Sequence, residues 1–441
     1  MLSVKGTLLY VSAFAGCTAI AAVWLGMAEE QPRAEAPAGF NTPSFNSAAS
    51  VSNGIPEPVT GDSFALDQQL FERNHQENSP DHTQTGLGPV YNATACVSCH
   101  ENPNTGGQSQ ITELRVGHND ATGMFVNPTI IINDGQDMIT GRSIVNDRAI
   151  CPQAQEHIPD TENIRALRAV LNTLGDGFVE AIDDQTLVEI AADQAQKTNG
   201  KIHGEVVQAP IFEAPGQTPQ TPVTRVGRFG WKDQHGSLLS FVADAYLNEM
   251  GVTSSLRPHT VTTVCQTTTD PEDARDALGM EDIDHFAQFI RGTMVPPRDT
   301  TLAMTDSAGR GEHLFAELGC RICHVDKIVT AKVGSVFNGG KFIVPDALGN
   351  KVIHPFGDFL LHDVGTGDGI VQVGPQDTAN KLRTAPLWGL RTHSRYMHDL
   401  KSLTLEDAIA RHKGEAAEAS GRFEELGGGD RQDLLNFLNS L

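Results

Sequence analysis

The chain has 441 residues and a formal net charge of -23, with 55 aspartates and glutamates against 32 lysines and arginines. This length allows two domains with cores of their own, and the acidic balance excludes nucleic acid and anionic membrane surfaces as expected partners. Aromatic residues make up only 6% and glycines number 43, which favours short helices joined by long loops. We therefore expect a mainly α fold.

The first predicted element is an N-terminal apolar segment. Lys5 precedes residues 7–27, which contain no charged residue, and Glu29 and Glu30 follow. The apolar core of a signal peptide has roughly 7–15 residues, whereas a membrane-spanning helix needs about 20. Residues 1–28 are thus predicted to be a cleaved signal peptide or a membrane anchor, with lipidation at Cys17 as a third alternative. Residues 29–60, rich in proline, alanine and serine, are predicted to form a flexible linker.

Two strings of the form C-x-x-C-H dominate the rest of the chain. They are Cys96-Val97-Ser98-Cys99-His100 and Cys320-Arg321-Ile322-Cys323-His324. At this spacing two thiols add to the two vinyl groups of one haem, and the adjacent histidine coordinates its iron. A zinc site of four cysteines is the alternative, but it would leave both histidines unused. We predict two covalently bound haem c groups, with His100 and His324 as axial ligands.

The two strings divide the body into two cytochrome c-like haem domains with long loops. Helices are expected at 64–71 and 306–319, each ahead of a string, and a terminal helix is expected at 434–441. We place the first domain, with a long insertion, at 61–298 and the second at 299–441.

Covalent attachment of haem occurs outside the cytoplasm, so the chain is expected to be exported. We predict a bacterial periplasmic protein, either free or anchored to the inner membrane by residues 7–27, with no other membrane contact. Cys151 and Cys265 remain after the haem cysteines and Cys17 are set aside. Two leftover cysteines in an exported protein most simply form a disulfide, and two buried thiols are the alternative.

The second haem needs either a further ligand or an open face. Thr404-Leu405-Glu406-Asp407 has the form of a capping box and predicts a helix on which His412 shares an apolar stripe with Leu405. His412 is therefore the candidate ligand, and Met397 competes with it. A histidine ligand would give a lower reduction potential than methionine.

A different set of residues follows the first string. Trp231 precedes a predicted helix on which Glu249 lies on the apolar side, near the helix end. Burial there would raise the pKa of Glu249 and suit it to carry protons at an open haem, as cleavage of peroxide requires. A solvated glutamate at a helix end is the alternative.

Several longer motifs together resemble one family. They are Gly86-Leu87-Gly88-Pro89, Gly227-Arg228-Phe229-Gly230-Trp231-Lys232, Asn248-Glu249-Met250-Gly251, Leu360-Leu361-His362-Asp363-Val364-Gly365, Arg383-Thr384-Ala385-Pro386-Leu387-Trp388-Gly389-Leu390 and Tyr396-Met397-His398-Asp399. From about Phe71 to its end the chain resembles the di-haem oxidoreductases related to bacterial di-haem cytochrome c peroxidases and MauG-type enzymes.

The resemblance implies roles for particular residues. Trp231 matches a tryptophan that lies between the haems, and Glu249 matches a catalytic glutamate, although their spacing here is about two residues shorter. His412 stands where the relatives carry a methionine or tyrosine ligand, which suggests a bis-histidine second haem. His118 is a weaker candidate for a histidine that caps the first iron in a resting state. The relatives also bind calcium between the haems.

The implied function is that of a peroxidase-like oxidoreductase. A soluble donor, such as a small cytochrome c or a cupredoxin, would supply electrons through haem two to haem one, where hydrogen peroxide is reduced. Two alternatives stay open from the sequence. One is a non-catalytic di-haem electron-transfer protein, and the other is an oxidase of a thiol or protein substrate.

Overall fold

The computed structural model describes residues 33–40, 61–77 and 86–441, with 219 and 267 excepted. Ala34–Leu441 forms one compact unit. The predicted apolar segment and residues 41–60 of the predicted linker lie outside the described residues. Within the described ranges, none of the helices has the length and apolar character needed to span a membrane.

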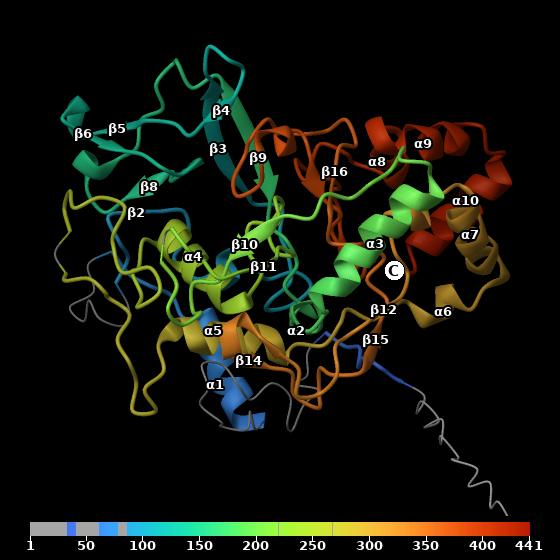
Figure 1. Cartoon of the computed structure of the whole chain (residues 1–441), viewed down its shortest axis with the longest axis horizontal. Coiled ribbons are helices and arrows are strands. Elements are labelled where there is room, and N and C mark those ends of the chain that lie inside the picture. The colour runs from blue at the N-terminus through green and yellow to red at the C-terminus, as the bar shows by residue number, and fades with distance from the viewer. Residues whose placement is uncertain (1–32, 41–60, 78–85, 219, 267) are drawn as a thin grey trace, which may run out of the picture. The chain divides into compact units, whose positions relative to one another are not determined.

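Each C-x-x-C-H string begins a short 3-10 turn, Cys96–Ser98 and Cys320–Ile322. Near the first string, helix α1 (Gly61–Glu72) packs against α5 (Asp282–Gly292), and near the second, α7 (Asp306–Glu317) packs against α10 (Gly428–Leu438). The two pairs are separate in the structure (Figure 1). The other helices are α2 (Asp176–Glu180), α3 (Asp184–Lys197), α4 (Leu238–Met250), α6 (Thr300–Ala303), α8 (Leu405–Ala410) and α9 (Ala417–Glu424).

The expectation of a mainly α fold is wrong. The structure is only 31% helical and has 17% strand, distributed over many small sheets. In the largest, β3 (Thr112–Asn119) pairs with β4 (Phe125–Val126), β7 (Ile144–Val145) and β9 (Ile164–Ala169), all antiparallel. Most of the other strands have two or three residues, too few to show the alternation of apolar and polar residues by which a strand is recognised.

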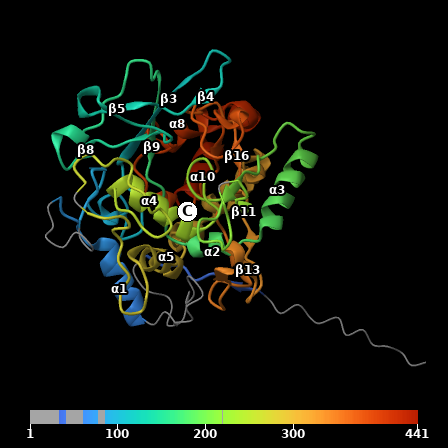
Figure 2. The ribbon, with the colours of Figure 1, turned by 60° about the vertical axis from the view of Figure 1, so that its left-hand side comes forward.

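The remaining strands form one sheet of three strands and several pairs. The three-stranded sheet has the order β1 (Ala34–Glu35), β15 (Lys351–Ile353), β12 (Ile328–Val329). The pairs are β2 (Val90–Tyr91) with β8 (Arg148–Ala149), β5 (Ile130–Ile132) with β6 (Asp137–Ile139), β10 (Gln208–Pro210) with β11 (Thr224–Val226), β13 (Val336–Phe337) with β14 (Phe342–Ile343), and β16 (Leu361–His362) with β17 (Leu382–Arg383). In two views α4 lies between the β3 sheet and the α1–α5 pair (Figures 1 and 2).

The apolar core crosses the predicted domain boundary. Its larger cluster combines Phe64 and Phe286 with Phe342 and Trp388, whereas a smaller cluster around Phe315 lies within the second range. The division at residue 298 therefore stays a prediction. The described part of the predicted linker is also bonded to the body, because β1 runs parallel to β15.

Cys151 and Cys265 form a disulfide across 114 residues. It joins the short helical turn after β8 to the loop between α4 and α5, so both of its ends lie in the range predicted for the first haem domain.

Candidate functional site

The last turn of α4 is hydrogen-bonded to the segment that precedes the first string. The backbone N–H groups of Asn92 and Ala93 donate to the carbonyl of Glu249, at 2.7 and 3.0 Å. Gly88 packs so tightly that a Cβ atom on it would lie 2.0 Å from the carbonyl oxygen of Gly251. These contacts explain why the glycine motif before Cys96 and the Glu249 motif occur together, and they place Glu249 close enough to Cys99 for electrostatic interaction.

The surroundings of Glu249 favour its protonated form. Burial raises the pKa of Glu249 to about 7, and the negative charge of Glu113 adds to this effect, while Asn92 and Arg115 oppose it. Asn92 Nδ2 donates to Glu249 Oε2 at 2.9 Å. Arg115 donates to both carboxylate oxygens of Glu113, at 2.5 and 3.0 Å. Burial opposes the charge of Glu113, but Arg115 holds its pKa below the usual value, so the proton of the pair resides on Glu249.

His100 completes the first site, which we define as Cys96, Cys99, His100 and Glu249. Its Nδ1 donates to the carbonyl of Gly107 at 3.1 Å, and Nε2 is the ring nitrogen that would bind a metal. Burial lowers the pKa of His100, and the neutral imidazole is the form that ligates iron. A backbone carbonyl on the second nitrogen is the usual arrangement for a metal-bound histidine, so these residues fit a haem.

The second site consists of Cys320, Cys323, His324 and His412, which line one cavity of about 1760 Å³, its open mouth included. His324 Nδ1 donates to the carbonyl of Phe356 at 2.9 Å, and His412 Nδ1 donates to that of Ala408 at 2.8 Å. The two rings face each other with centroids 6.4 Å apart. An ion bound to two imidazole nitrogens at about 2 Å needs ring centres roughly 6 Å apart, so this site fits a haem with two histidine ligands.

The positions of His412 and Met397 differ from the expected ones in detail. The predicted helix ends at Ala410, so His412 lies two residues beyond it, and its N–H donates to Ile409 at 3.0 Å. Met397 lines the same cavity and has a left-handed backbone with φ of 68°. Of the two candidates, His412 is the one whose ring faces His324.

Trp231 is bonded to a segment that also reaches the first site. It lines the cavity of the second site, and its indole N–H donates to the carbonyl of Ala169 at 2.8 Å. Two residues after Ala169, the backbone of Leu171 lies within hydrogen-bonding reach of His100. Lys232, the residue after Trp231, fixes the loop that carries both residues. Its buried Nζ donates to three backbone carbonyls of residues 378–381 at 2.7–3.0 Å.

The structure does not bring His118 to the first site. It lies on β3, five residues beyond Glu113, which corresponds to roughly 17 Å along a strand. Its Nδ1 donates to Glu162 at 2.8 Å.

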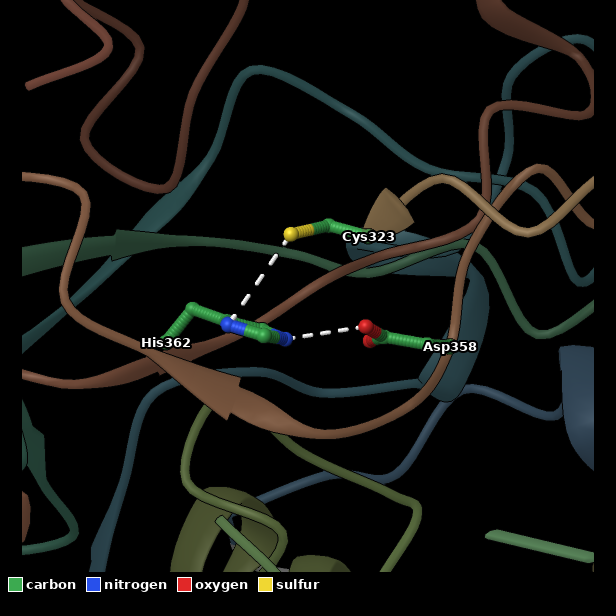
Figure 3. A group of neighbouring side chains, drawn as sticks. All are labelled: Cys323, Asp358 and His362. Carbon is green, nitrogen blue, oxygen red and sulfur yellow. Dashed lines mark hydrogen bonds and ion pairs between the residues drawn. The ribbon is translucent and has the colours of Figure 1, made fainter. Parts of the chain in front are cut away.

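Sequence reasoning missed one group of neighbouring residues at the second site, shown in Figure 3: the half-buried Cys323 and the buried Asp358 and His362. Among the described residues, these are the ones whose ligand atoms lie close enough together to hold a metal ion. However, Cys323 belongs to the haem string, and both ring nitrogens of His362 are paired with carboxylates, at 2.9 Å each. The motif Leu360–Gly365 was the available signal. Only Asp358 in this group provides the hard oxygen ligands of which calcium takes about six to eight, so calcium stays a prediction from the resemblance.

Two C-x-x-C-H sites that fit haem, one beside a buried carboxyl group of raised pKa and the other with a second histidine, are typical of a di-haem oxidoreductase. The chain belongs to the family described as "di-haem oxidoreductase, putative peroxidase", whose profile matches residues 160–441. It is thus a peroxidase-like oxidoreductase with haem cofactors. The first string lies ahead of the matched range.

Comparison with other proteins adds only distant likenesses. No curated protein matches the chain. Among solved structures, the Kuenenia stuttgartiensis hydrazine synthase is 14% identical with a TM-score of 0.35, and the match covers 92% of this chain and 99% of that one. A MauG-like protein associated with microbial copper homeostasis is also 14% identical, with a TM-score of 0.40 and coverage of 91% and 95%.

Proposed function

We propose that the chain is a di-haem c-type peroxidase that reduces hydrogen peroxide at the first site with electrons that a soluble donor delivers to the second. The observation that carries the proposal is the difference between the sites. At the second, His412 faces His324, whereas at the first a carboxyl group with a pKa of about 7, that of Glu249, lies near Cys99. A bound haem would supply one-electron redox chemistry and, where the protein leaves its iron open, a binding position for peroxide.

Glu249 would handle the protons of the reaction. Reduction of one hydrogen peroxide to two waters consumes two protons and two electrons. A carboxyl group with a pKa near the working pH can deliver one of these protons to the leaving oxygen from its acid form and then take up the next proton. Asn92 holds Oε2 of Glu249 through its amide, which fixes the direction in which the carboxyl group points. Trp231, which lines the second cavity, would provide an aromatic ring for electron transfer to the first site.

The other elements of the proposal follow from covalent haem attachment. Thioether links at Cys96, Cys99, Cys320 and Cys323 require export, and the Cys151–Cys265 disulfide suits an oxidising compartment. We propose a periplasmic location and a donor such as a small cytochrome c or a cupredoxin. Haem staining of the denatured chain tests the attachment, because replacing both cysteines of one string with serine should halve the signal.

The decisive experiment compares the holoprotein with Glu249→Gln and with Glu189→Gln, a control on an exposed glutamate of α3. Donor oxidation by peroxide is expected to fall about 10²- to 10⁴-fold in Glu249→Gln, with unchanged haem content, and to persist in the control. Electron paramagnetic resonance with and without peroxide reports the ligation of each iron. If peroxide changes neither the spectrum nor donor oxidation, the proposal is wrong, and low-spin iron at both sites would favour an electron-transfer protein. Faster oxidation of a thiol or protein substrate would favour an oxidase.

A further inference from the structure

His362, on β16, lies beside the carboxylate of Asp358 and the sulfur of Cys323 at the second site (Figure 3). Its side chain is only 1% exposed. Nε2 donates to Asp358 at 2.9 Å and Nδ1 donates to Glu415 at 2.9 Å. An imidazole that donates from both nitrogens must carry both protons. Burial opposes that charge, but Asp358 and Glu415 outweigh it and hold the pKa of His362 well above its usual value. His362 is therefore a buried cation between two anions.

One of these carboxylates, that of Asp358, is linked to the segment that carries the second haem string. Gln194 donates from its Nε2 both to Asp358, at 2.6 Å, and to the carbonyl of Ile322, at 2.8 Å. Ile322 lies inside the string, and Cys323 Sγ lies 3.9 Å from Nδ1 of His362. Through Asp358, the ring is thus tied to the segment that ends in His324.

The other carboxylate belongs to the loop that carries His412. The backbone N–H of Glu415 donates to the carbonyl of Asp363 at 2.9 Å, and Lys413 donates to that of Val364 at 2.8 Å. In return, Asp363 N–H donates to the Glu415 side chain at 3.3 Å. Between them, Gly414 has a φ of 51°, and a Cβ atom on it would lie 2.4 Å from the carbonyl oxygen of Asp363. The loop therefore lies directly against the residues that follow His362.

We propose that His362 is a positioning residue that holds His412 at the second site. Through Asp358 it is joined to the segment that carries His324, and through Glu415 it is joined to the loop that carries His412. The inference rests on the proposed function, because it takes His412 as the second axial ligand. It assigns a role to the Leu360–Gly365 motif. His412 lies beyond the end of α8 and is held by the helix only through its bonds to Ile409 and Ala408, so attachment of the following loop adds to its placement.

Carbon monoxide binding to the reduced holoprotein tests this inference. Glu415→Ala removes the contact on the loop side, His362→Gln removes the charge, and His412→Ala provides a fully open reference. Glu418→Ala is the matched control, because Glu418 carries the same charge nearby on α9 but is exposed. In the unaltered protein and the control, the second haem is expected to stay low-spin and closed to carbon monoxide. In Glu415→Ala and His362→Gln, carbon monoxide should bind at the second haem about tenfold faster or more, as expected for loss of a charged hydrogen bond.

Two further measurements separate the possible outcomes. A high-spin fraction in the oxidised Glu415→Ala and His362→Gln proteins, converted to low-spin by added imidazole, would show that His412 has left the iron. Glu415→Gln, which keeps an acceptor for Asp363, should open the site less than Glu415→Ala. If these variants behave like the unaltered protein while His412→Ala opens the site, the inference is wrong and the proposed function stands. If His412→Ala itself stays low-spin and closed, the ligand assignment in the proposed function fails.

Discussion

Replacing Glu113 with glutamine should shift the pH dependence of the peroxide reaction without abolishing it. Glu113 is the negative charge beside Glu249, and Arg115 holds it ionised. Because the pKa of Glu249 is raised to about 7, its acid form is present below that pH and is lost above it. Removal of the neighbouring charge should lower this pKa by about one unit. At about pH 7 the protonated fraction would then fall from about one half to roughly one tenth, a fivefold loss of rate.

The assay is stopped-flow mixing of the holoprotein with peroxide from roughly pH 5 to 9, followed at the haem absorption bands. At about pH 5 both proteins should react at the same rate, because Glu249 is protonated in each. Infrared titration of the protonated carboxyl group gives the same pKa without any turnover. Glu113→Asp keeps the charge and serves as the control. A loss of rate by one constant factor at every pH would refute the reasoning, since it would mean that Glu113 acts only through the local structure.

Three further predictions concern Trp231, His412 and the disulfide. Trp231→Phe keeps an aromatic ring but loses the hydrogen bond to Ala169, so electron transfer between the sites, measured after flash reduction, should slow while the haem spectra stay unchanged. His412→Met should raise the reduction potential of the second haem, which a potentiometric titration would show, and an unchanged potential would contradict its assignment as ligand. Replacing Cys151 and Cys265 with serine should lower the free energy of unfolding by about 2–5 kcal/mol, as measured with denaturant.

Some of the helices could be predicted, whereas the sheets could not, for a physical reason visible in β9. There, Leu167 is 47% exposed while Arg168 is buried, the reverse of the pattern that identifies a strand with one buried face. The burial of Arg168 is possible because Asp368 accepts from its Nε at 2.6 Å. That partner lies 200 residues away in the chain, and no local pattern reveals it.

The candidate site shows the same division between local and distant information. Glu249 could be found because its helix has an apolar side and because it belongs to a motif. Glu113 could not, since it contacts Glu249 only after β3 has been brought against the end of α4. One of the links is Arg142, which follows β6 and reaches Asn248 at 3.4 Å. Such contacts between distant segments determine which glutamates of the chain become buried.

The two haem sites begin from the same local structure, so their difference must come from what approaches them. In both, the string forms a 3-10 turn, and Nδ1 of the following histidine donates to a backbone carbonyl, of Gly107 for His100 and of Phe356 for His324. The other groups at each site arrive from elsewhere in the chain: Glu249 from the end of α4 and His412 from the loop after α8. A change in either of these elements should therefore alter one site and leave the other intact. Trp231 is the exception, since it lines the second cavity and bonds to Ala169, two residues before Leu171, whose backbone lies within reach of His100.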